Sequence, residues 1–518
     1  MPLDRPRPVR PHPSGDTEGL ARTTSQRPVW SPKVARSGSF ERLTGWLDWI
    51  VLFGLSAVAI VAPLAYGGVQ THVWASLALV TAGLLVIWSS ARVIDRTVAL
   101  PMNRFGWVAL VLGLPLAWAG LQLAPWMPAA FHHPLWSEAA RLTGMPVDGL
   151  ITVDAGATRA GLARLGLYVG VGFLAAQLAR NRRHARVLVG TVVIGAVTSA
   201  GLGLADALTQ GHLLAPIPDQ AWVTGTFVNR NHFATLAGLG LLAAVALAVQ
   251  PLRGALSDPA GRRGRLLNVA HAVFGSNGLV WGASVLLLMA LLMSVSRAGV
   301  AASVTGLCVL VVVLARSGRV RARYAGAAVA VSLGVVTCFF LLVGTETAER
   351  FTASVGQFEA RRLAYMATLQ AIAARPLLGT GLGTFRDVFE AYQPAELHNT
   401  WYNAHNTYLE NALELGVPAA LLLALAPAIA TVQCWRGLRR RRRDQQYPAL
   451  AIAATVLVGL HATLDSSLEM PGVTLPYVIL LAAGFAQSFP TAPRSGSASP
   501  PGGPVRASPR SQATSRER

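Results

Sequence analysis

The stretch NAHNTYLENALELGVP carries a histidine and two asparagines in front of a short acidic segment. Thr407 and Glu410 match the S/T-x-x-E capping box, which predicts that a helix starts at Thr407. His405 and Asn406 would then precede a first helical turn whose free N–H groups favour an anion. A neutral imidazole accepts a proton from a hydroxyl group near neutral pH. His405, supported by Asn406, is therefore a candidate general base. The alternative is a histidine that only hydrogen-bonds the helix end.

Two other polar clusters contain an arginine beside apolar sequence. TGTFVNRNHFA places Asn229, Arg230, Asn231 and His232 directly before an apolar stretch, and SVSRAGV places Arg297 between two apolar stretches. A planar guanidinium group suits bidentate contact with phosphate oxygens. We expect Arg230 and Arg297 together to neutralise a pyrophosphate. The alternative for Arg230 is a side chain that extends to the membrane surface.

The segment HATLDSSLEMP contributes His461, Asp465 and Glu469. Either carboxylate can pair with one of the arginines or orient His405, because both follow a predicted span at the same side as the histidine motif. The alternative is an ordinary polar turn. Of the two carboxylates, Asp465 is our candidate for a residue that supports the site.

The segment RPLLGTGLGTF spaces three glycines so closely that it predicts a tight turn, with its backbone N–H groups forming an anion nest. It is not a nucleotide-binding fingerprint, since no G-x-G-x-x-G follows a strand. Upstream, Arg361 and Arg362 lie at the start of the helical stretch predicted around 359–374, which is predicted to lie on the membrane surface. Arg362 is a supporting candidate, and a solvated face or lipid-headgroup contact is the alternative.

The composition predicts the elements that must position these residues. Of 518 residues, 53% are hydrophobic and 13% are charged, whereas a soluble domain has roughly a quarter of its residues charged. The apolar residues fall in blocks of about 20, the length that crosses a hydrocarbon core about 30 Å thick. We therefore predict an all-α polytopic membrane protein with about twelve transmembrane helices.

The spans and their connections predict a topology. The predicted spans are residues 46–66, 71–91, 106–125, 160–179, 187–207, 232–250, 279–296, 298–315, 323–343, 416–435, 448–464 and 472–489. Every second connection, starting after the second span, is rich in arginine. The positive-inside rule places these connections and both tails in the cytoplasm, which requires an even number of spans.

The predicted organisation follows from this topology. Residues 1–42 and 490–518 are tails predicted to be disordered, 43–343 hold spans one to nine, 344–415 form a large outward loop, and 416–489 hold spans ten to twelve. A connection of about 70 residues is far longer than usual and is predicted to be functional. It ends in the histidine motif, at the outer mouth of span ten.

The net charge of +20 does not predict a nucleic-acid partner, because the arginines lie in the tails and between apolar blocks. Orientation in the membrane and contact with anionic lipids explain them. The cysteines, Cys308, Cys338 and Cys434, are far apart in apolar sequence, so we expect neither a disulfide nor a CxxC metal site.

At these residues the chain resembles the O-antigen ligase family, which includes O-antigen polymerases and bacterial protein O-oligosaccharyltransferases. The histidine motif of the family, H-[NSQ]-x9-G-x-x-[GTY], reads here as His405-Asn406, nine residues and Gly416, and it ends on Ala419, which departs from the pattern. The resemblance covers most of the chain and implies a GT-C-like glycosyltransferase architecture with a large periplasmic loop between spans nine and ten.

The resemblance also implies a reaction. Members of the family take a glycan from undecaprenyl pyrophosphate on the periplasmic face of the bacterial inner membrane. They attach it to a hydroxyl group of lipid A–core, of another glycan repeat or of a protein serine, without a metal or nucleotide cofactor. By resemblance, His405 is the base for the acceptor hydroxyl, and Arg230 and Arg297 hold the lipid-linked pyrophosphate.

We therefore predict a glycosyltransferase that uses a lipid-linked oligosaccharide and inverts the sugar in a single displacement. An O-antigen or exopolysaccharide polymerase of the same superfamily is the first alternative. A lipid-linked glycan transporter and a non-catalytic scaffold are alternatives of other classes. A transporter usually places its ionisable residues at mid-membrane, whereas here they gather at the outer boundary.

Overall fold

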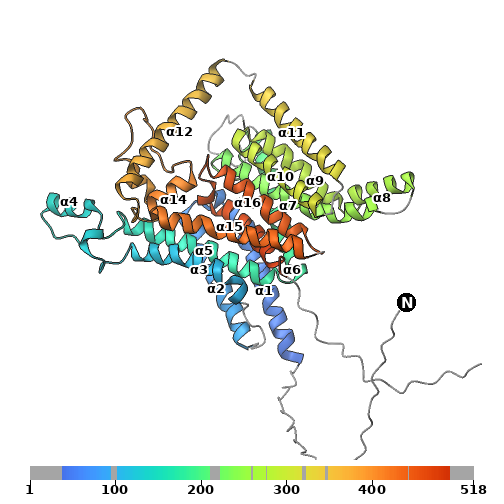
Figure 1. The fold of residues 1–518 in the computed structure, drawn as a ribbon, viewed down its shortest axis with the longest axis horizontal. Helices are drawn as coiled ribbons and strands as arrows, with labels where there is room; N and C mark the ends of the chain where they lie inside the picture. The colour runs from blue at the N-terminus through green and yellow to red at the C-terminus, as the bar shows by residue number, and fades with distance from the viewer. Residues whose placement is uncertain are drawn as a thin grey trace, which may run out of the picture. The chain divides into compact units, whose positions relative to one another are not determined.

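The computed structural model describes residues 38–94, 102–209, 222–257, 261–275, 277–317, 322–344, 348–441 and 443–489. Within these residues all regular secondary structure is helical (Figure 1), which confirms the all-α prediction. The chain divides into a short unit, Met1–Leu43, and a main unit, Thr44–Arg518, to which the following paragraphs refer. The predicted disordered tails lie outside the described residues, except that helix α1 already begins at Gly38.

Each of the twelve predicted spans overlaps one helix. The helices and their bounds are α1 Gly38–Leu64, η1 Tyr66–Gly68, α2 Thr71–Ile94, α3 Met102–Leu121, η2 Ala129–Phe131, α4 Pro134–Thr143, α5 Ala155–Leu178, α6 Arg182–Leu208, α7 Arg230–Ser257, α8 Arg262–Phe274, α9 Gly278–Met293, α10 Arg297–Arg316, α11 Ala322–Gly344, α12 Ala348–Ala374, α13 Phe385–Phe389, α14 Thr407–Leu415, α15 Val417–Arg440, α16 Gln446–His461, η3 Ser467–Glu469 and α17 Pro471–Ala486.

The helices establish a multi-pass membrane protein. Among the described residues, seven helices are long and apolar enough to cross a membrane: Thr44–Leu64, Thr71–Val93, Ala155–Leu178, Arg182–Leu208, Arg230–Val249, Arg297–Arg316 and Val417–Arg440. Helices α8 and α9 meet at 68° and make an eighth span if they are one broken helix. Segments of α3, α11, α16 and α17 are apolar but shorter, so the count of twelve stays a prediction.

Helix α7, which begins at Arg230, is the most buried of the seven candidate spans. Helix α7 packs against α6, α9, α10 and α16, and α16 also packs against α15 and α17. Gly238 of α7 lies directly against Ser303 of α10, and Gly484 of α17 lies against Ala451 of α16. Small residues at these contacts let helix backbones approach closely in a membrane, where packing rather than water exclusion drives association.

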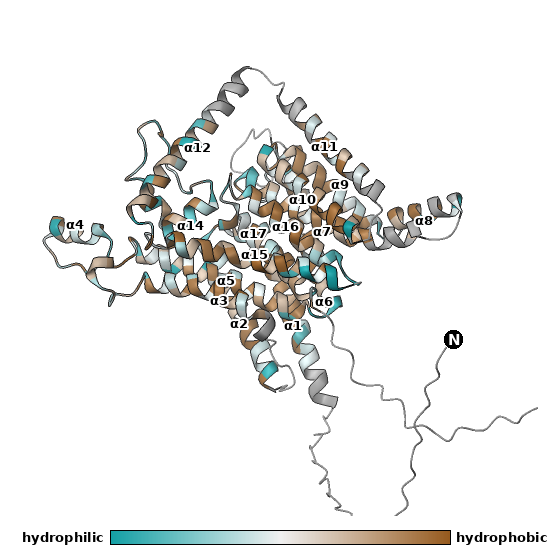
Figure 2. Ribbon diagram, in the orientation of Figure 1, coloured by the Kyte–Doolittle hydropathy of each residue, from teal (hydrophilic) through white to brown (hydrophobic). Residues whose placement is uncertain are grey.

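The long helices consist mostly of hydrophobic residues (Figure 2). Large apolar side chains on several of them are exposed, among them Leu79 and Val86 of α2, Leu279 of α9 and Leu421 of α15. Exposed apolar side chains on long helices are expected where the helices contact lipid tails.

The helix ends sort into two groups, the first of which contains the histidine motif. The Thr226 hydroxyl donates to the Pro63 carbonyl (2.6 Å), joining the end of α1 to the segment before α7. The Thr407 N–H donates to the Ala462 carbonyl (3.0 Å), which joins the start of α14 to the end of α16. These are the ends that the charge pattern predicts to face outward.

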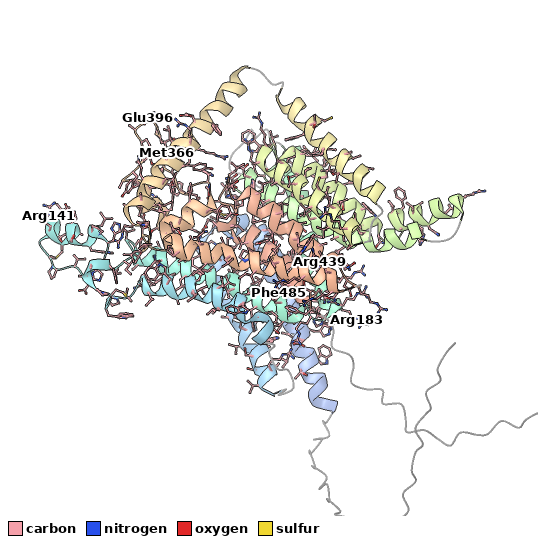
Figure 3. The ribbon with its side chains drawn as sticks, in the orientation of Figure 1. Arg141, Arg183, Met366, Glu396, Arg439 and Phe485 are labelled. Carbon is pink, nitrogen blue, oxygen red and sulfur yellow. The ribbon has the colours of Figure 1, made fainter. Side chains whose placement is uncertain are left out.

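The second group contains the arginine-rich connections. Arg92 pairs with Asp48, Arg182 pairs with Asp444, and the Gln487 side chain donates to the Ala179 carbonyl (2.6 Å). Figure 3 labels Arg183 and Arg439 at this end and Arg141, Met366 and Glu396 far from it. The fold therefore separates the arginine-rich connections from the histidine motif, as an alternating topology requires.

The segment 344–415 contains three helices rather than an irregular loop. Helix α12 starts at Ala348, eleven residues before the predicted start at 359. It packs on α13 and α14 through a small core that includes Ala364, Phe385, Phe389 and Leu413. The segment thus forms a compact helical structure with its own apolar interior, which holds the histidine motif.

The glycine-rich turn is a structural joint. The N–H groups of Thr380 and Gly381 donate to carbonyls at the end of α14, and the Leu382 N–H donates to the Gln122 side chain of the segment after α3. The N–H of Phe385, the last residue of the turn, donates to the side-chain carboxyl group of Glu414 (3.1 Å). The predicted nest is thus occupied by a carboxyl group of the protein itself. Gly416, the glycine of the histidine motif, has φ +78° and turns the chain from α14 into α15.

Replacement of Gly381 by alanine should destabilise the outward segment. Gly381 has φ +111°, and an added Cβ atom would collide with Thr152. We expect the free energy of unfolding to fall by about 1–3 kcal/mol, seen as a lower melting temperature in detergent. Gly356→Ala is the matched control, because Gly356 lies in α12 with open space around it and should gain about 0.5–1 kcal/mol. Equal melting temperatures for the two variants would contradict this account.

Candidate active site

Asp465 is the centre of the polar cluster. Its buried carboxylate lies 3.3 Å from His405 Nδ1, 3.4 Å from His232 Nε2 and 2.7 Å from the Ser467 hydroxyl, which donates to it. These partners come from the loop before α14, from α7 and from η3. The structure thus resolves the choice between two carboxylates, because Asp465 and not Glu469 contacts the candidate base.

The carboxylate of Asp465 is held in its ionised form. Burial by itself would raise the pKa of Asp465, but interaction with His232 and His461 and the hydrogen bonds from His405 and Ser467 outweigh burial and lower it below its usual range. An ionised carboxylate only accepts hydrogen bonds, so His405 must donate its Nδ1–H. The Nε2 lone pair of His405 is then free to accept a proton.

The backbone around His405 is fixed in an unusual conformation. His405 has φ +50°, and its carbonyl accepts a hydrogen bond from the Tyr365 hydroxyl (2.9 Å). The Trp401 ring meets the His405 imidazole edge to face, with 5.5 Å between ring centroids. The His405 side chain is nevertheless 32% exposed, so a substrate can reach it. A non-glycine residue with positive φ is often found where function requires a particular orientation.

Helix α14 begins at Thr407 as predicted, but its cap differs from the prediction. Asn406 is the N-cap residue, and its side chain accepts hydrogen bonds from the N–H groups of Tyr408 and Leu409. The Asn406 amide also donates to the Thr463 carbonyl (3.1 Å). The capping-box interpretation of Thr407 and Glu410 is therefore wrong, because the asparagine one residue earlier already occupies the cap.

Glu410 instead braces the histidine loop. Its buried carboxylate accepts hydrogen bonds from the Asn403 amide, the Ala404 N–H and the Ser466 hydroxyl. Burial, and to a lesser extent the charge of Glu469, raises the pKa of Glu410 to about 8, against the effect of these three donors. Glu410 thus ties the loop that carries His405 to the residue that follows Asp465.

Three arginines gather beside this cluster. Arg230 and Arg297 are the first residues of α7 and α10, and the Ser296 hydroxyl donates to the Asn231 side chain (2.8 Å), which joins the two helix starts. Arg230 lies close enough to Arg297 and Arg361 for their charges to interact. No carboxylate of the described residues pairs with these three guanidinium groups. Unpaired cations at one place favour a bound anion.

The arginines and the histidine belong to one site. Arg361 of α12 interacts electrostatically with Tyr365, whose hydroxyl binds the His405 carbonyl. On the other side, Arg230 is two residues from His232, which contacts Asp465. Helices α7, α10, α12 and α16 therefore bring these groups together at the outward-predicted end of the bundle.

The remaining predicted residues separate into those inside and those outside this cluster. Asn229 accepts a hydrogen bond from the Asn231 N–H (2.8 Å) and supports the start of α7. Arg362, in contrast, pairs with Glu359 on the exposed face of α12, with 3.0 Å between Nε and the carboxylate. The structure thus places Arg361, not Arg362, beside the other arginines.

The sequence analysis named Arg361 but retained Arg362, and it missed Tyr365, Ser467 and Thr235. Arg361 and Tyr365 are four residues apart, a spacing that puts both on one face of a helix, and this signal could have separated Arg361 from its neighbour. Ser467 and Thr235 left no signal in the sequence, because single hydroxyl residues are common in turns and helices.

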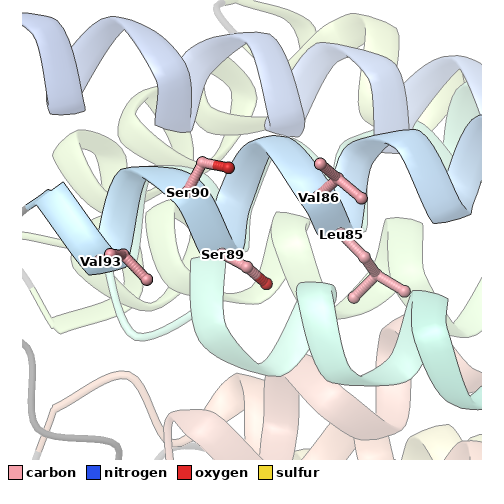
Figure 4. A pocket seen from close by; sticks show the side chains of 5 residues that line it. All are labelled: Leu85, Val86, Ser89, Ser90 and Val93. Carbon is pink, nitrogen blue, oxygen red and sulfur yellow. The ribbon is translucent and has the colours of Figure 1, made fainter.

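A groove lies elsewhere on the molecule. Leu85, Val86, Ser89, Ser90 and Val93 of α2 line it (Figure 4). These residues come from the half of α2 that leads to Arg92, which pairs with Asp48 at the arginine-rich end. The groove therefore does not belong to the site around His405.

The fold and the site define a multi-pass helical membrane protein with a histidine–aspartate pair beside a cluster of arginines at one end of the helices. Residues 282–424 match the family described as O-Antigen ligase, which confirms the resemblance found in the sequence. The match covers residues 282–424 only and supports a likeness to the O-antigen ligase/polymerase superfamily, whose members are glycosyltransferase- or ligase-type enzymes. No match was found among curated proteins.

The family match covers only part of the site. Arg297, Arg361 and His405 lie within residues 282–424, whereas Arg230 and Asp465 lie outside them. The fold therefore adds to the family match, because it brings Arg230 and Asp465 from outside the matched segment close to the histidine motif.

Proposed function

We propose that the protein transfers a glycan from undecaprenyl pyrophosphate to an acceptor hydroxyl group at the outer face of the bacterial inner membrane. The observation that carries the proposal is the His405–Asp465 pair, 3.3 Å apart, beside three arginines for which the described part of the chain offers no carboxylate partner. The pair provides a base, and the arginines provide the charge that a pyrophosphate leaving group needs.

The proposed reaction is one inverting displacement. The Nε2 atom of His405 takes the proton of the acceptor hydroxyl while its oxygen attacks the anomeric carbon of the donor sugar. The bond between that carbon and the pyrophosphate oxygen breaks, and undecaprenyl pyrophosphate leaves with the electron pair. Asp465 keeps the proton on Nδ1 and stabilises the imidazolium that forms. No redox partner is required.

The arginines act on the donor. Arg230, Arg297 and Arg361 stabilise the negative charge that develops on the pyrophosphate as the bond breaks. Because Arg230 and Arg297 begin the apolar helices α7 and α10, a pyrophosphate bound there would have its lipid tail beside those helices. This location explains why the polar motif lies directly against apolar sequence.

The position of the site supports an enzyme over a transporter. A transporter for lipid-linked glycans would use ionisable residues near the middle of the helices. The residues that meet here are at helix ends or in the segments that follow them: Arg230 begins α7, Arg297 begins α10, and Asp465 follows α16. The acceptor is left open among lipid A–core, a glycan repeat and a protein serine.

The test is transfer by the purified protein in proteoliposomes. The donor is an undecaprenyl-pyrophosphate-linked glycan, and each of the three acceptor types is offered separately. We expect a glycosylated product and an equal amount of released undecaprenyl pyrophosphate with one acceptor, which also separates a ligase from a polymerase. Movement of the intact donor across the bilayer without a new glycosidic bond would instead establish a transporter.

Arg361 and Arg362 provide a matched pair of variants for the donor site. Removing Arg361 should raise the KM for the donor about 10- to 100-fold, because a hydrogen bond to a charged group contributes about 1.5–3 kcal/mol. Arg362→Ala should stay within about twofold of the wild type, since an exposed ion pair contributes little. Steady-state kinetics with varied donor concentration measure both. Equal effects of the two variants would remove Arg361 from the donor site.

A further inference from the structure

A buried chain of hydrogen bonds continues behind Asp465. The Ser467 hydroxyl, which donates to Asp465, also lies 3.1 Å from His461 Nδ1. The Thr235 hydroxyl lies 2.7 Å from the same Nδ1 atom and 3.2 Å from the Ser467 oxygen. All four side chains are buried. His461 ends this chain, and the proposed reaction assigns it no role.

Counting protons assigns the tautomer of His461. Ser467 has one hydroxyl proton, which it donates to Asp465, and Thr235 has one, for which the Asn231 carbonyl at 3.0 Å is an acceptor. The His461 Nδ1 atom then lies against two hydroxyl oxygens that can only accept. Both contacts are satisfied when His461 carries its proton on Nδ1 and donates it to them.

The other ring nitrogen supports the same assignment. His461 Nε2 is buried and has no hydrogen-bond partner among the residues that the structure describes. If Nε2 carried the proton, a buried N–H donor would stay unsatisfied, and Nδ1 would face the lone pairs of Ser467. In a neutral His461 with its proton on Nδ1, the lone pair of Nε2 is the one polar group without a partner in the described residues. Leaving that acceptor unpaired costs less free energy than leaving a buried N–H donor unpaired and placing Nδ1 against the lone pairs of Ser467.

We propose that His461 is a positioning residue for the proposed reaction and that it acts through Ser467. By donating to the Ser467 oxygen, His461 directs the Ser467 proton onto Oδ2 of Asp465. His232 reaches the same oxygen from α7. With Oδ2 held from both sides, Oδ1 faces His405 and fixes the proton of His405 on Nδ1. Successive donors also polarise one another, which strengthens each hydrogen bond.

This inference rests on the proposed function, and a pair of variants at His461 tests it. Asparagine places an amide N–H where Nδ1–H stands, whereas leucine has a similar size and no donor. We expect His461→Leu to lower kcat about 10-fold or more, with the KM for the donor unchanged, and His461→Asn to stay within about threefold. If the two variants are equally active, His461 only fills space and the proposal is wrong.

A double-mutant cycle tests the route through Ser467. Ser467→Ala should lower kcat, and His461→Leu should then cause no further loss, because the effect of His461 has already been removed. Additive losses would show that His461 acts by another route. Melting temperatures of the variants show whether any loss of kcat comes from unfolding.

A spectroscopic measurement keeps the inference separate from the proposed function. Nitrogen NMR of the ¹⁵N-histidine-labelled protein in lipid bilayers reports which ring nitrogen carries the proton, whether or not the protein transfers a glycan. We expect Nδ1–H at both His461 and His405, and a mixture of tautomers at His405 in His461→Leu. Protonated Nε2 at His461, or an unchanged His405, would overturn the positioning role even in an active enzyme. Absence of transfer by the wild type would overturn only the proposed function.

Discussion

Replacement of His405 by alanine is expected to lower the rate of glycan transfer by about 10²–10⁴-fold, the contribution typical of a positioned general base. The rate falls because the acceptor hydroxyl group would have to lose its proton to water. Some transfer remains because the pyrophosphate still activates the donor. The KM for the donor should change little, since the arginines that bind it are untouched. The measurement is initial rate in proteoliposomes with saturating donor.

His398→Ala is the control for this variant. His398 is exposed and lies seven residues before His405 in the same segment, so it has the same chemistry without the contact to Asp465. It should transfer at the wild-type rate. Both variants should insert into the membrane and give similar melting temperatures. A His405→Ala protein with full activity would end the role of His405 as base.

Replacement of Asp465 by asparagine is expected to be nearly as damaging, with a loss of about 10²–10⁴-fold in kcat. The Ser467 hydroxyl donates to Oδ2, so the new amide must place its oxygen there and its NH₂ group toward His405. An NH₂ donor forces His405 to accept at Nδ1 and to carry its proton on Nε2. The imidazole then cannot take a proton from the acceptor.

The same transfer assay measures this loss, and the NMR measurement on ¹⁵N-labelled histidine shows its cause. We expect the proton of His405 to move from Nδ1 to Nε2 in Asp465→Asn. Asp387→Asn, an exposed carboxylate on α13, is the control for loss of one negative charge. A variant at Asp465 that retains full kcat would show that the carboxylate only holds the loops together.

Local patterns in the sequence predicted the helices well. Each predicted span is a continuous apolar block, and hydrophobic length and loop charge are properties of neighbouring residues, so no tertiary information is needed to read them. His405, Arg230 and Arg297 were found for the same reason, because a polar or charged residue beside a membrane span is costly and therefore conspicuous.

It was harder to predict from the sequence which of two similar residues belongs to the site, and which partner a side chain binds. Arg361 and Arg362 are neighbours in the chain. Arg362 pairs with Glu359 three residues earlier in the same helix, whereas the packing of α12 brings Arg361 close to Arg230. The capping box was misread because the hydrogen bonds of Glu410 go to the loop before α14 and to Ser466, which is 56 residues away. A local motif cannot show that a distant donor is present.

The sequence by itself therefore determined the all-helical membrane fold and the residue types of the site. The tertiary structure decided which carboxylate meets His405, 60 residues away, and which hydroxyl meets His461, 226 residues away. The physical reason is that a buried charge or tautomer is set by the few hydrogen-bond partners within about 3 Å. In this chain those partners come from α7, α16, η3 and the loop before α14.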